Sequence, residues 1–337
     1  MTTAVICPEV CPADLEGALR AAGIAETVAD VRRVGAAAPM LSRWRVRTGR
    51  GEYLWVDVPG AGWHGDPALP VAATVLTHGC ELAGDDHAEA RHPVPLPGVG
   101  WAYRTPWPAD VLGHSVVEGV MAGRPMPRGL AGACFQIGAF LRRLHAAPLT
   151  SGVPSRRLPP PLERLRTPPE GSLLAVDPTW RRMTEAVGTW SDEEAALLHG
   201  QLGLAHLLVP AEGPASGPVV CLIGWSGELI GPASFDLGQV MGDLLEVAAL
   251  FAGRAGTAVP ILLDAARAVR DGYEATPGRP LAADFWPAAS RAACVKVLDH
   301  DARRVRAFGQ ATVPGALLGR VAESLLEPGT VVGGVFR

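Results

Sequence analysis

The sequence predicts an α+β protein of two lobes, a small β-rich N-lobe and a larger, mainly helical C-lobe. Residues 27–58 contain three candidate strands, and residues 42–48 alternate charged and apolar side chains as a half-buried strand does. The segment 122–125, Ala-Gly-Arg-Pro, is typical of a turn. Beyond it, apolar residues recur at helical spacing nearly to the C-terminus. The predicted domains are therefore an N-lobe at residues 1–121, with a hinge at its end, and a C-lobe at residues 122–337.

The N-lobe is expected to begin with a helix at residues 12–22 and to contain a hairpin at residues 42–58. In the first strand of this hairpin, Arg43, Arg45 and Arg47 share one face, because side chains alternate along a strand. Three guanidinium groups on one face suit a phosphate or an acidic peptide. An exposed strand face without a ligand is the alternative explanation.

The C-lobe pattern consists of helices interrupted by one hairpin. This hairpin is expected where the apolar run 207–209 and the β-branched run 219–223 flank a Pro/Gly-rich turn. Ser191 is a candidate N-cap followed by three acids, so a further helix is expected to begin there. The other helices are predicted at residues 129–145, 177–190, 236–253, 258–273, 282–310 and 315–326.

The composition is that of a folded globule without a polyelectrolyte partner. Of 337 residues, 48% are hydrophobic and 19% charged, and the formal net charge of −4 gives no reason to expect nucleic acid or an anionic membrane. The N-terminus lacks the basic and apolar regions of a secretory signal, and no apolar run is long enough to cross a bilayer. The six cysteines form no CxxC pair, which favours free thiols. We therefore expect a cytoplasmic protein with no nucleic-acid and no membrane partner.

Two residue types are almost or wholly missing from the chain. Lys296 is the only lysine, and there is no asparagine. The Ala/Gly/Pro/Arg bias is typical of a GC-rich genome and accounts for their scarcity. It does not account for their absence from a site whose chemistry requires them.

Four segments, in order along the chain, resemble the aminoglycoside phosphotransferase and choline kinase-like family, which has a protein-kinase-like fold. Residues 112–126 are similar to the family's hinge strand and the turn after it, and residues 137–148 to a helix that ends in a Leu-His-Ala signature. Residues 199–209 are similar to the catalytic loop, and residues 223–238 to the metal-binding loop. The resemblance implies a bilobal protein-kinase-like fold.

The same segments depart from the family's catalytic pattern. In the family loop H-G-D-x-x-x-x-N, Gln201 replaces the acid and His206 replaces the asparagine. An amide cannot act as a base, and magnesium prefers oxygen ligands to imidazole. In the loop I-D-W-G-D, Gly224 stands in place of the acid that chelates the metal. The family scaffold is kept at His199, Trp225 and Asp236, the last with an implied role in bracing the catalytic loop.

The third strand departs as well. The resemblance implies a lysine there that binds the nucleotide phosphates, but the position holds Trp55 or Val56. The base, the metal ligands and this lysine are thus missing together.

These departures favour a degenerate, pseudokinase-like member that binds a protein or peptide partner, or a small molecule in the interlobe cleft. A bacterial natural-product complex that modifies a peptide is the expected setting. No cofactor is expected in that case.

The alternative is an active ATP- and magnesium-dependent phosphotransferase with rearranged ligands, which phosphorylates a small molecule or Ser/Thr of a precursor peptide before elimination. Glu228 or Asp243 would then hold the metal, although plain surface or helix acids explain both residues too. An antibiotic-resistance kinase is the least favoured class, because it needs the missing acids.

Overall fold

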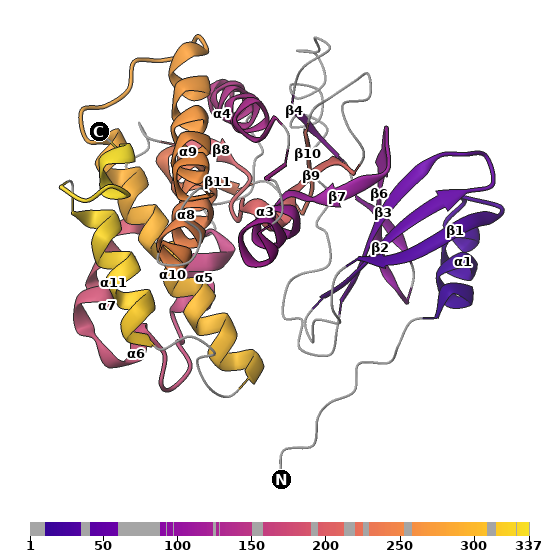
Figure 1. Ribbon diagram of the computed structural model, residues 1–337, viewed down its shortest axis with the longest axis horizontal. Coiled ribbons are helices and arrows are strands. Elements are labelled where there is room, and N and C mark those ends of the chain that lie inside the picture. The colour runs from indigo at the N-terminus through magenta and orange to yellow at the C-terminus, as the bar shows by residue number, and fades with distance from the viewer. Residues whose placement is uncertain are drawn as a thin grey trace.

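The computed structural model shows the two lobes that the sequence predicts (Figure 1). A five-stranded sheet and one helix form most of the N-lobe, while helices make up most of the C-lobe, so the α+β prediction is confirmed. The structure describes residues 11–34, 41–59, 88–91, 93–96, 98–123, 126–127, 129–149, 158–189, 195–211, 220–224, 229–252, 258–308, 315–327 and 329–336.

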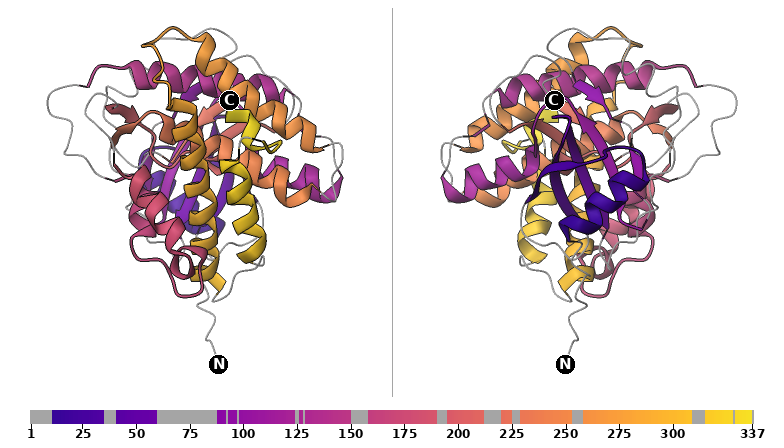
Figure 2. Two further views of the ribbon diagram at one scale, coloured as in Figure 1. Left: turned by 90° about the vertical axis from the view of Figure 1, so that its left-hand side faces the viewer. Right: turned by 90° about the vertical axis from the view of Figure 1, so that its right-hand side faces the viewer.

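The N-lobe sheet is antiparallel and has the strand order β1-β2-β3-β6-β5. Helix α1 lies across the sheet face that is turned away from the C-lobe (Figure 2), with Leu15 and Leu19 buried in one cluster with Leu54 and Val56 of β3. The predicted first helix and the hairpin at residues 42–58 are confirmed. The bounds are α1 (Pro12–Ala21), β1 (Val28–Val34), β2 (Leu41–Thr48), β3 (Tyr53–Pro59), β5 (Val94–Leu96) and β6 (Gly100–Thr105).

Two small sheets pack against the helices of the C-lobe. One has the order β4-β10-β9-β7 and contains the hairpin predicted around residues 207–223, while the other pairs β8 with β11. Both hairpin strands are buried, because one side of their sheet faces the N-lobe aromatics and the other faces the helices. The bounds are β4 (Ala88–Ala90), β7 (Ala109–Val111), β8 (Ala195–Leu198), β9 (Leu207–Pro210), β10 (Val220–Leu222) and β11 (Leu229–Pro232).

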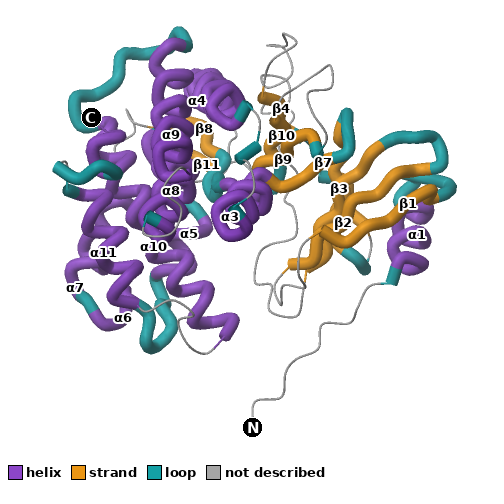
Figure 3. Tube along the Cα trace, viewed as in Figure 1, coloured by secondary structure: helices purple, strands orange, loops and turns teal. Residues whose placement is uncertain are grey.

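The C-lobe helices pack side by side (Figure 3), and α4 and α9 approach each other closely at two glycines. A Cβ at Gly138 of α4 would overlap the carbonyl oxygen of Val269 in α9, and one at Gly272 would overlap that of Phe135. The helices are α3 (Leu112–Ala122), α4 (Leu130–Ala146), α5 (Pro160–Leu165), α6 (Leu173–Val176), α7 (Pro178–Val187), α8 (Ser234–Phe251), α9 (Ala258–Ala275), α10 (Phe285–Phe308) and α11 (Gly315–Leu326), with the 3-10 turns η2 (Leu204–His206) and η3 (Gly333–Phe336).

Two predicted elements are wrong. Residues 112–122, expected to hold a hinge strand, form helix α3, because Leu112, Val116 and Val120 recur every fourth residue and bury one helical face. Ala195–Leu198, expected in a helix that starts at Ser191, is strand β8, paired with β11. Residues 191–194 lie outside the described part of the chain. The domain boundary at residues 121/122 stays a prediction.

Two further expectations concern the cysteines and the bilayer. Four cysteines lie in the described part of the chain, and all are free thiols. None of the described helices combines the length and the hydropathy that crossing a bilayer requires.

Candidate functional site

A loop at residues 199–206 lies at the centre of the molecule and is held in place by Asp236 of α8. The buried carboxylate accepts hydrogen bonds from the backbone N–H groups of His199 (2.7 Å) and Gly200 (2.9 Å). His145 Nε2 lies 3.3 Å from the same carboxylate, and His145 Nδ1 lies 3.1 Å from the hydroxyl of Tyr273. One carboxylate thus fixes where the loop begins and joins it to helices α4 and α9.

The loop runs beside the end of β10, where Ile223 and Gly224 lie. His199 Nε2 is 2.9 Å from the carbonyl oxygen of Ile223, and the backbone N–H of Ile223 donates to the carbonyl of His206 (2.9 Å). The side-chain amide of Gln201 donates to the carbonyl of Gly224 (3.0 Å). Gln201 therefore ties the two loops together as a donor.

The imidazole of His206 occupies the space beside Gly224. Gly224 has φ +75°, and a Cβ there would overlap Cδ2 of His206. The Nδ1 atom of His206 is enclosed and has no hydrogen-bond partner within the described ranges. Burial, reinforced by the nearby His199 and Lys296, holds the pKa of His206 well below its usual value, so the ring is neutral at pH 7. A side chain at position 224 and this imidazole compete for one volume.

Aromatic side chains fill the space between the N-lobe sheet and this loop region. Trp55, Tyr103 and Trp107 are fully buried in one cluster with apolar residues of β9 and β10, among them Leu208 and Ile223. Burial, with a smaller effect of the nearby Asp57, raises the pKa of Tyr103 well above its usual value. The two lobes are therefore in direct contact here through buried side chains.

The three arginines of β2 have three different environments. Arg43 Nε lies 3.5 Å from Oδ1 of the buried Asp57 on β3, which also accepts a hydrogen bond from Trp55 Nε1 (2.9 Å). Burial raises the pKa of Asp57, against the opposing effect of Arg43. Arg45 lines a recess beside α3, and Arg47 is exposed. Next to the position where the resemblance implies a lysine, β3 thus has a buried acid.

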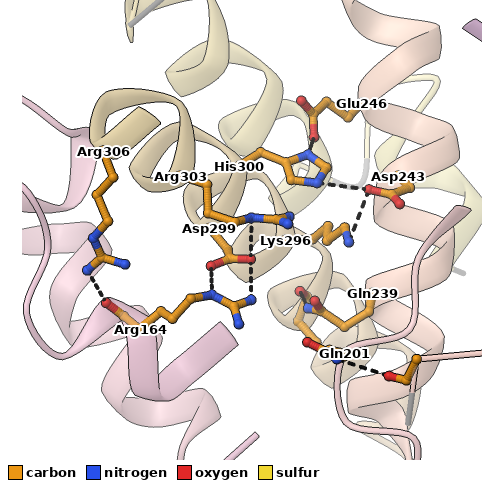
Figure 4. Close-up of polar contacts among 12 residues, drawn as sticks. Arg164, Gln201, Gln239, Asp243, Glu246, Lys296, Asp299, His300, Arg303 and Arg306 are labelled. Atoms are coloured by element: carbon orange, nitrogen blue, oxygen red, sulfur yellow. Dashed lines mark hydrogen bonds and ion pairs between the residues drawn. The ribbon is translucent and has the colours of Figure 1, made fainter. Parts of the chain in front are cut away.

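The only lysine of the chain lies next to the loop at residues 199–206. Lys296 of α10 places Nζ 3.4 Å from Oδ1 of Asp243, whose other oxygen accepts the backbone N–H of Leu204 (2.7 Å; Figure 4). Both side chains are buried, and a Cβ at Gly203 would overlap Lys296 Nζ. Burial lowers the pKa of Lys296, and Asp243 opposes that shift. Asp243 braces the middle of the loop much as Asp236 braces its start.

Further charges continue this network along α10. His300 lies between two acids, with Nδ1 2.6 Å from Glu246 and Nε2 3.5 Å from Asp243 (Figure 4). Ligand atoms of these three residues all lie within 4.8 Å of one another, a spacing that would suit a metal ion. Two cations already offset the negative charge of this group: Lys296 pairs with Asp243, and Arg304 lies 3.4 Å from Glu246.

Asp299 of α10 is also paired with cations. Arg164 binds Asp299 through two hydrogen bonds of 2.8 and 2.7 Å, and Arg303 Nε lies 3.1 Å from the same carboxylate. Burial opposes ionisation of Asp299, but Arg303 and Arg164 outweigh it and hold its pKa well below the usual range.

This geometry can be set beside known proteins. A family model described as "Phosphotransferase enzyme family" matches residues 42–277. The chain belongs to the phosphotransferase enzyme family. No curated protein sequence matches the chain.

Solved structures show the fold of this phosphotransferase family member. A choline/ethanolamine kinase family protein from Mesorhizobium loti matches with a TM-score of 0.52 at 14% identity, covering 95% of this chain and 98% of that one. Amicoumacin kinase hAmiN, solved with AMP-PNP, Ca2+ and Ami, gives a TM-score of 0.52 at 10% identity, covering 94% and 95%. Likeness at such identities shows the fold alone, and the bilobal, protein-kinase-like prediction is confirmed.

Some site residues of this phosphotransferase family member were missed or stay unplaced. Lys296 and Asp57 lie at the site although sequence reasoning passed over them. The unusual rarity of lysine was the available signal for the first, and an acid in an apolar strand for the second. Trp225 and Glu228, named from the sequence, lie outside the described residues.

Proposed function

We propose that this member of the phosphotransferase family has kept the fold and exchanged phosphate transfer for binding. It acts in the cytoplasm as a partner subunit, in a bacterial natural-product complex that modifies a peptide. The observation that carries the proposal is the imidazole of His206, which occupies the volume that a metal-chelating side chain at Gly224 would need.

Catalysis of phosphoryl transfer depends on groups that the departures at Gln201 and Gly224 remove. The reaction depends on positioning and on metal-centred charge stabilisation. Gln201 donates its amide to Gly224 and cannot take a proton, while Gly224 has no side chain to bind a metal. Loss of one preorganised donor elsewhere costs about 3 kcal/mol of transition-state stabilisation. Several such losses together leave no basis for efficient turnover.

The buried aromatic cluster supports the same proposal. The resemblance implies a nucleotide between the lobes, yet Trp55, Tyr103 and Trp107 are packed there against β9 and β10 without exposure. A purine ring would have to displace these side chains. Interiors are close-packed, so such displacement opposes binding.

A second candidate function is an active, ATP- and Mg2+-dependent phosphotransferase with rearranged ligands, which phosphorylates a small molecule or Ser/Thr of a precursor peptide. The closeness of Asp243, Glu246 and His300 favours it. A metal ion on Asp243 Oδ1 would displace Lys296, whose Nζ lies 3.4 Å from that oxygen, and leave it as a buried charge without its nearest acid. Breaking a buried ion pair costs about 3–5 kcal/mol, which weighs against this candidate.

Isothermal titration calorimetry with ATP, with and without Mg2+, tests the proposal. We expect no magnesium-dependent ATP binding and no transfer of labelled phosphate to peptide or small-molecule acceptors. The proposal would be wrong if ATP bound tightly with Mg2+ and binding was lost in a folded Asp243→Asn/Glu246→Gln variant. Circular dichroism shows whether that variant is folded.

The partner role has its own test. If the gene has neighbours that encode a precursor peptide and a lyase, these products are co-expressed with the chain and analysed by size-exclusion chromatography. We expect a stable complex with at least one of them. Separate elution of all components at micromolar concentration would contradict the partner role.

A further inference from the structure

A recess of about 230 Å³ lies between the N-lobe sheet and helix α3. One wall carries Arg32, Arg33 and Val34 of β1 and Arg45 of β2. The other carries Asp110 of β7 with His114, Ser115 and Glu118 of α3. Figure 1 shows α3 between the sheet and the helical lobe, so the recess belongs to the boundary of the two lobes. Neither candidate function has used these side chains.

The two arginines on the sheet wall are placed unfavourably for the free protein. The register of β1 and β2 sets Arg32 directly opposite Arg45. Like charges that face each other across an antiparallel pair destabilise it. Arg32 has an ion pair of 2.9 Å with Asp30, but both side chains are largely exposed, so that pair contributes little.

Arg45 is the less satisfied of the two. Its Nε atom is enclosed and finds no hydrogen-bond partner among the residues that the structure describes. A buried donor that is left unsatisfied is costly for folding. Opposed cations and an enclosed free donor on one wall of a recess are the arrangement that an anion would stabilise.

We propose that this recess binds a small oxyanion, a phosphate or carboxylate group on a molecule about the size of an amino acid, between Arg32 and Arg45. Guanidinium groups present paired N–H donors that match both kinds of anion. The volume lies below the roughly 300–1,000 Å³ of pockets for drug-sized ligands, which limits the ligand to a small molecule or one modified residue of a peptide. This inference rests on the proposed binding role and names the ligand class for it.

The opposite wall defines the rest of the ligand. Asp110, Glu118 and Ser115 offer acceptors to a hydroxyl or ammonium group next to the anion. His114 and Ser115 offer donors. Phosphoserine and glutamate both have this combination of groups. Trp55 and Trp107 fill the neighbouring interior, so the site has no extension for a purine.

Calorimetric titration of the full chain with phosphoserine, glutamate and serine at low salt tests the proposal. We expect phosphoserine or glutamate to bind at least about tenfold more tightly than serine. Arg45→Gln and Arg32→Gln should each weaken that binding by about tenfold or more, because each removes a charged donor pair. Arg47→Gln is the matched control, since Arg47 lies on the same strand outside the recess, and it should leave binding unchanged.

The thermal midpoint without ligand gives a second readout. Arg45→Gln should leave it unchanged or raise it, because the variant removes a like-charge pair. The proposal is overturned if neither anion binds more tightly than serine, or if Arg47→Gln weakens binding as much as Arg45→Gln does. Magnesium-dependent ATP binding that is insensitive to Arg45→Gln would count against the proposed function alone and leave an oxyanion site standing.

Discussion

At the scale of single residues, two departures from the family pattern, at Gly224 and His206, lie side by side in space. The sequence predicts that Gly224 cannot chelate a metal, but only the structure shows that His206 fills the volume next to it. The two positions are 18 residues apart in the chain and belong to different loops, so no local pattern relates them. The same holds for Lys296, which meets Asp243 from a helix some fifty residues further along.

Restoring an acid at Gly224 should therefore destabilise the protein rather than repair it. We expect Gly224→Asp to lower the free energy of unfolding by about 2–4 kcal/mol, from positive φ and from overlap with His206. Gly51→Asp is the control, because Gly51 has φ +83° with open space around it, and it should cost about 1 kcal/mol.

A double-mutant cycle combines Gly224→Asp with His206→Asn, which is also made alone. Because the smaller side chain releases the contested volume, it should recover about 1 kcal/mol or more. Urea unfolding followed by circular dichroism measures all four proteins. Additive effects of the two substitutions would contradict a shared volume.

Burial of neutral His206 also predicts how stability depends on pH. Its pKa in the folded state lies well below the value of 6.5 that it regains on unfolding. Between these pKa values the unfolded state binds more protons, so the free energy of unfolding falls as pH decreases below about 6.5. Urea unfolding at pH 8 and pH 5.5 should show this loss, and His206→Asn should reduce it. Identical pH slopes for the two proteins would show that the imidazole is not buried in its neutral form.

At the scale of elements, the sequence predicts those whose own pattern decides their structure. The hairpin at residues 42–58, helix α4 and the central hairpin all follow from alternation or helical spacing. Helix α3 was missed because its valines favour strand by propensity, while burial of Leu112, Val116 and Val120 favours helix. Strand β8 was missed because its partner β11 lies thirty residues away. Family motifs in the sequence name His199, Gln201 and Asp236 as candidate site residues, whereas Lys296 was missed because it reaches the loop from a distant helix.

The contact between α4 and α9 gives a prediction at this scale. Gly138→Ala should lower the free energy of unfolding by about 2 kcal/mol or more, since the new Cβ would overlap the backbone of α9 at Val269. Gly132→Ala on the same helix is the matched control, because a Cβ there meets open space. It should stabilise the protein by about 0.5–1 kcal/mol through helix propensity. Thermal unfolding of both variants measures the difference, and a stable Gly138→Ala variant would argue against the close approach.

At the scale of the whole molecule, the aromatic cluster makes one cooperative unit of the two lobes. Trp55 and Tyr103 come from the N-lobe sheet, while Leu208 comes from β9 and Ile223 directly follows β10. Relative movement of the lobes would open this buried contact and expose apolar surface to water. That exposure costs about 25 cal/mol of free energy per Å² of apolar area. The cluster includes Ile223, next to Gly224, so the candidate site lies at this contact between the lobes.

Unfolding should therefore occur in a single transition for both lobes. Far-ultraviolet circular dichroism reports mainly the helical lobe, and three of the nine tryptophans, Trp55, Trp101 and Trp107, lie in the cluster. We expect the urea midpoints of circular dichroism and tryptophan fluorescence to coincide. Trp55→Ala should cost about 3–5 kcal/mol and separate the two midpoints, because the cavity lies where the lobes join. Leu15→Ala, a large-to-small change under α1 and away from the lobe boundary, should destabilise the protein while the midpoints stay together. Separate midpoints in the unmodified protein would show that the lobes are independent and that the cluster does not join them.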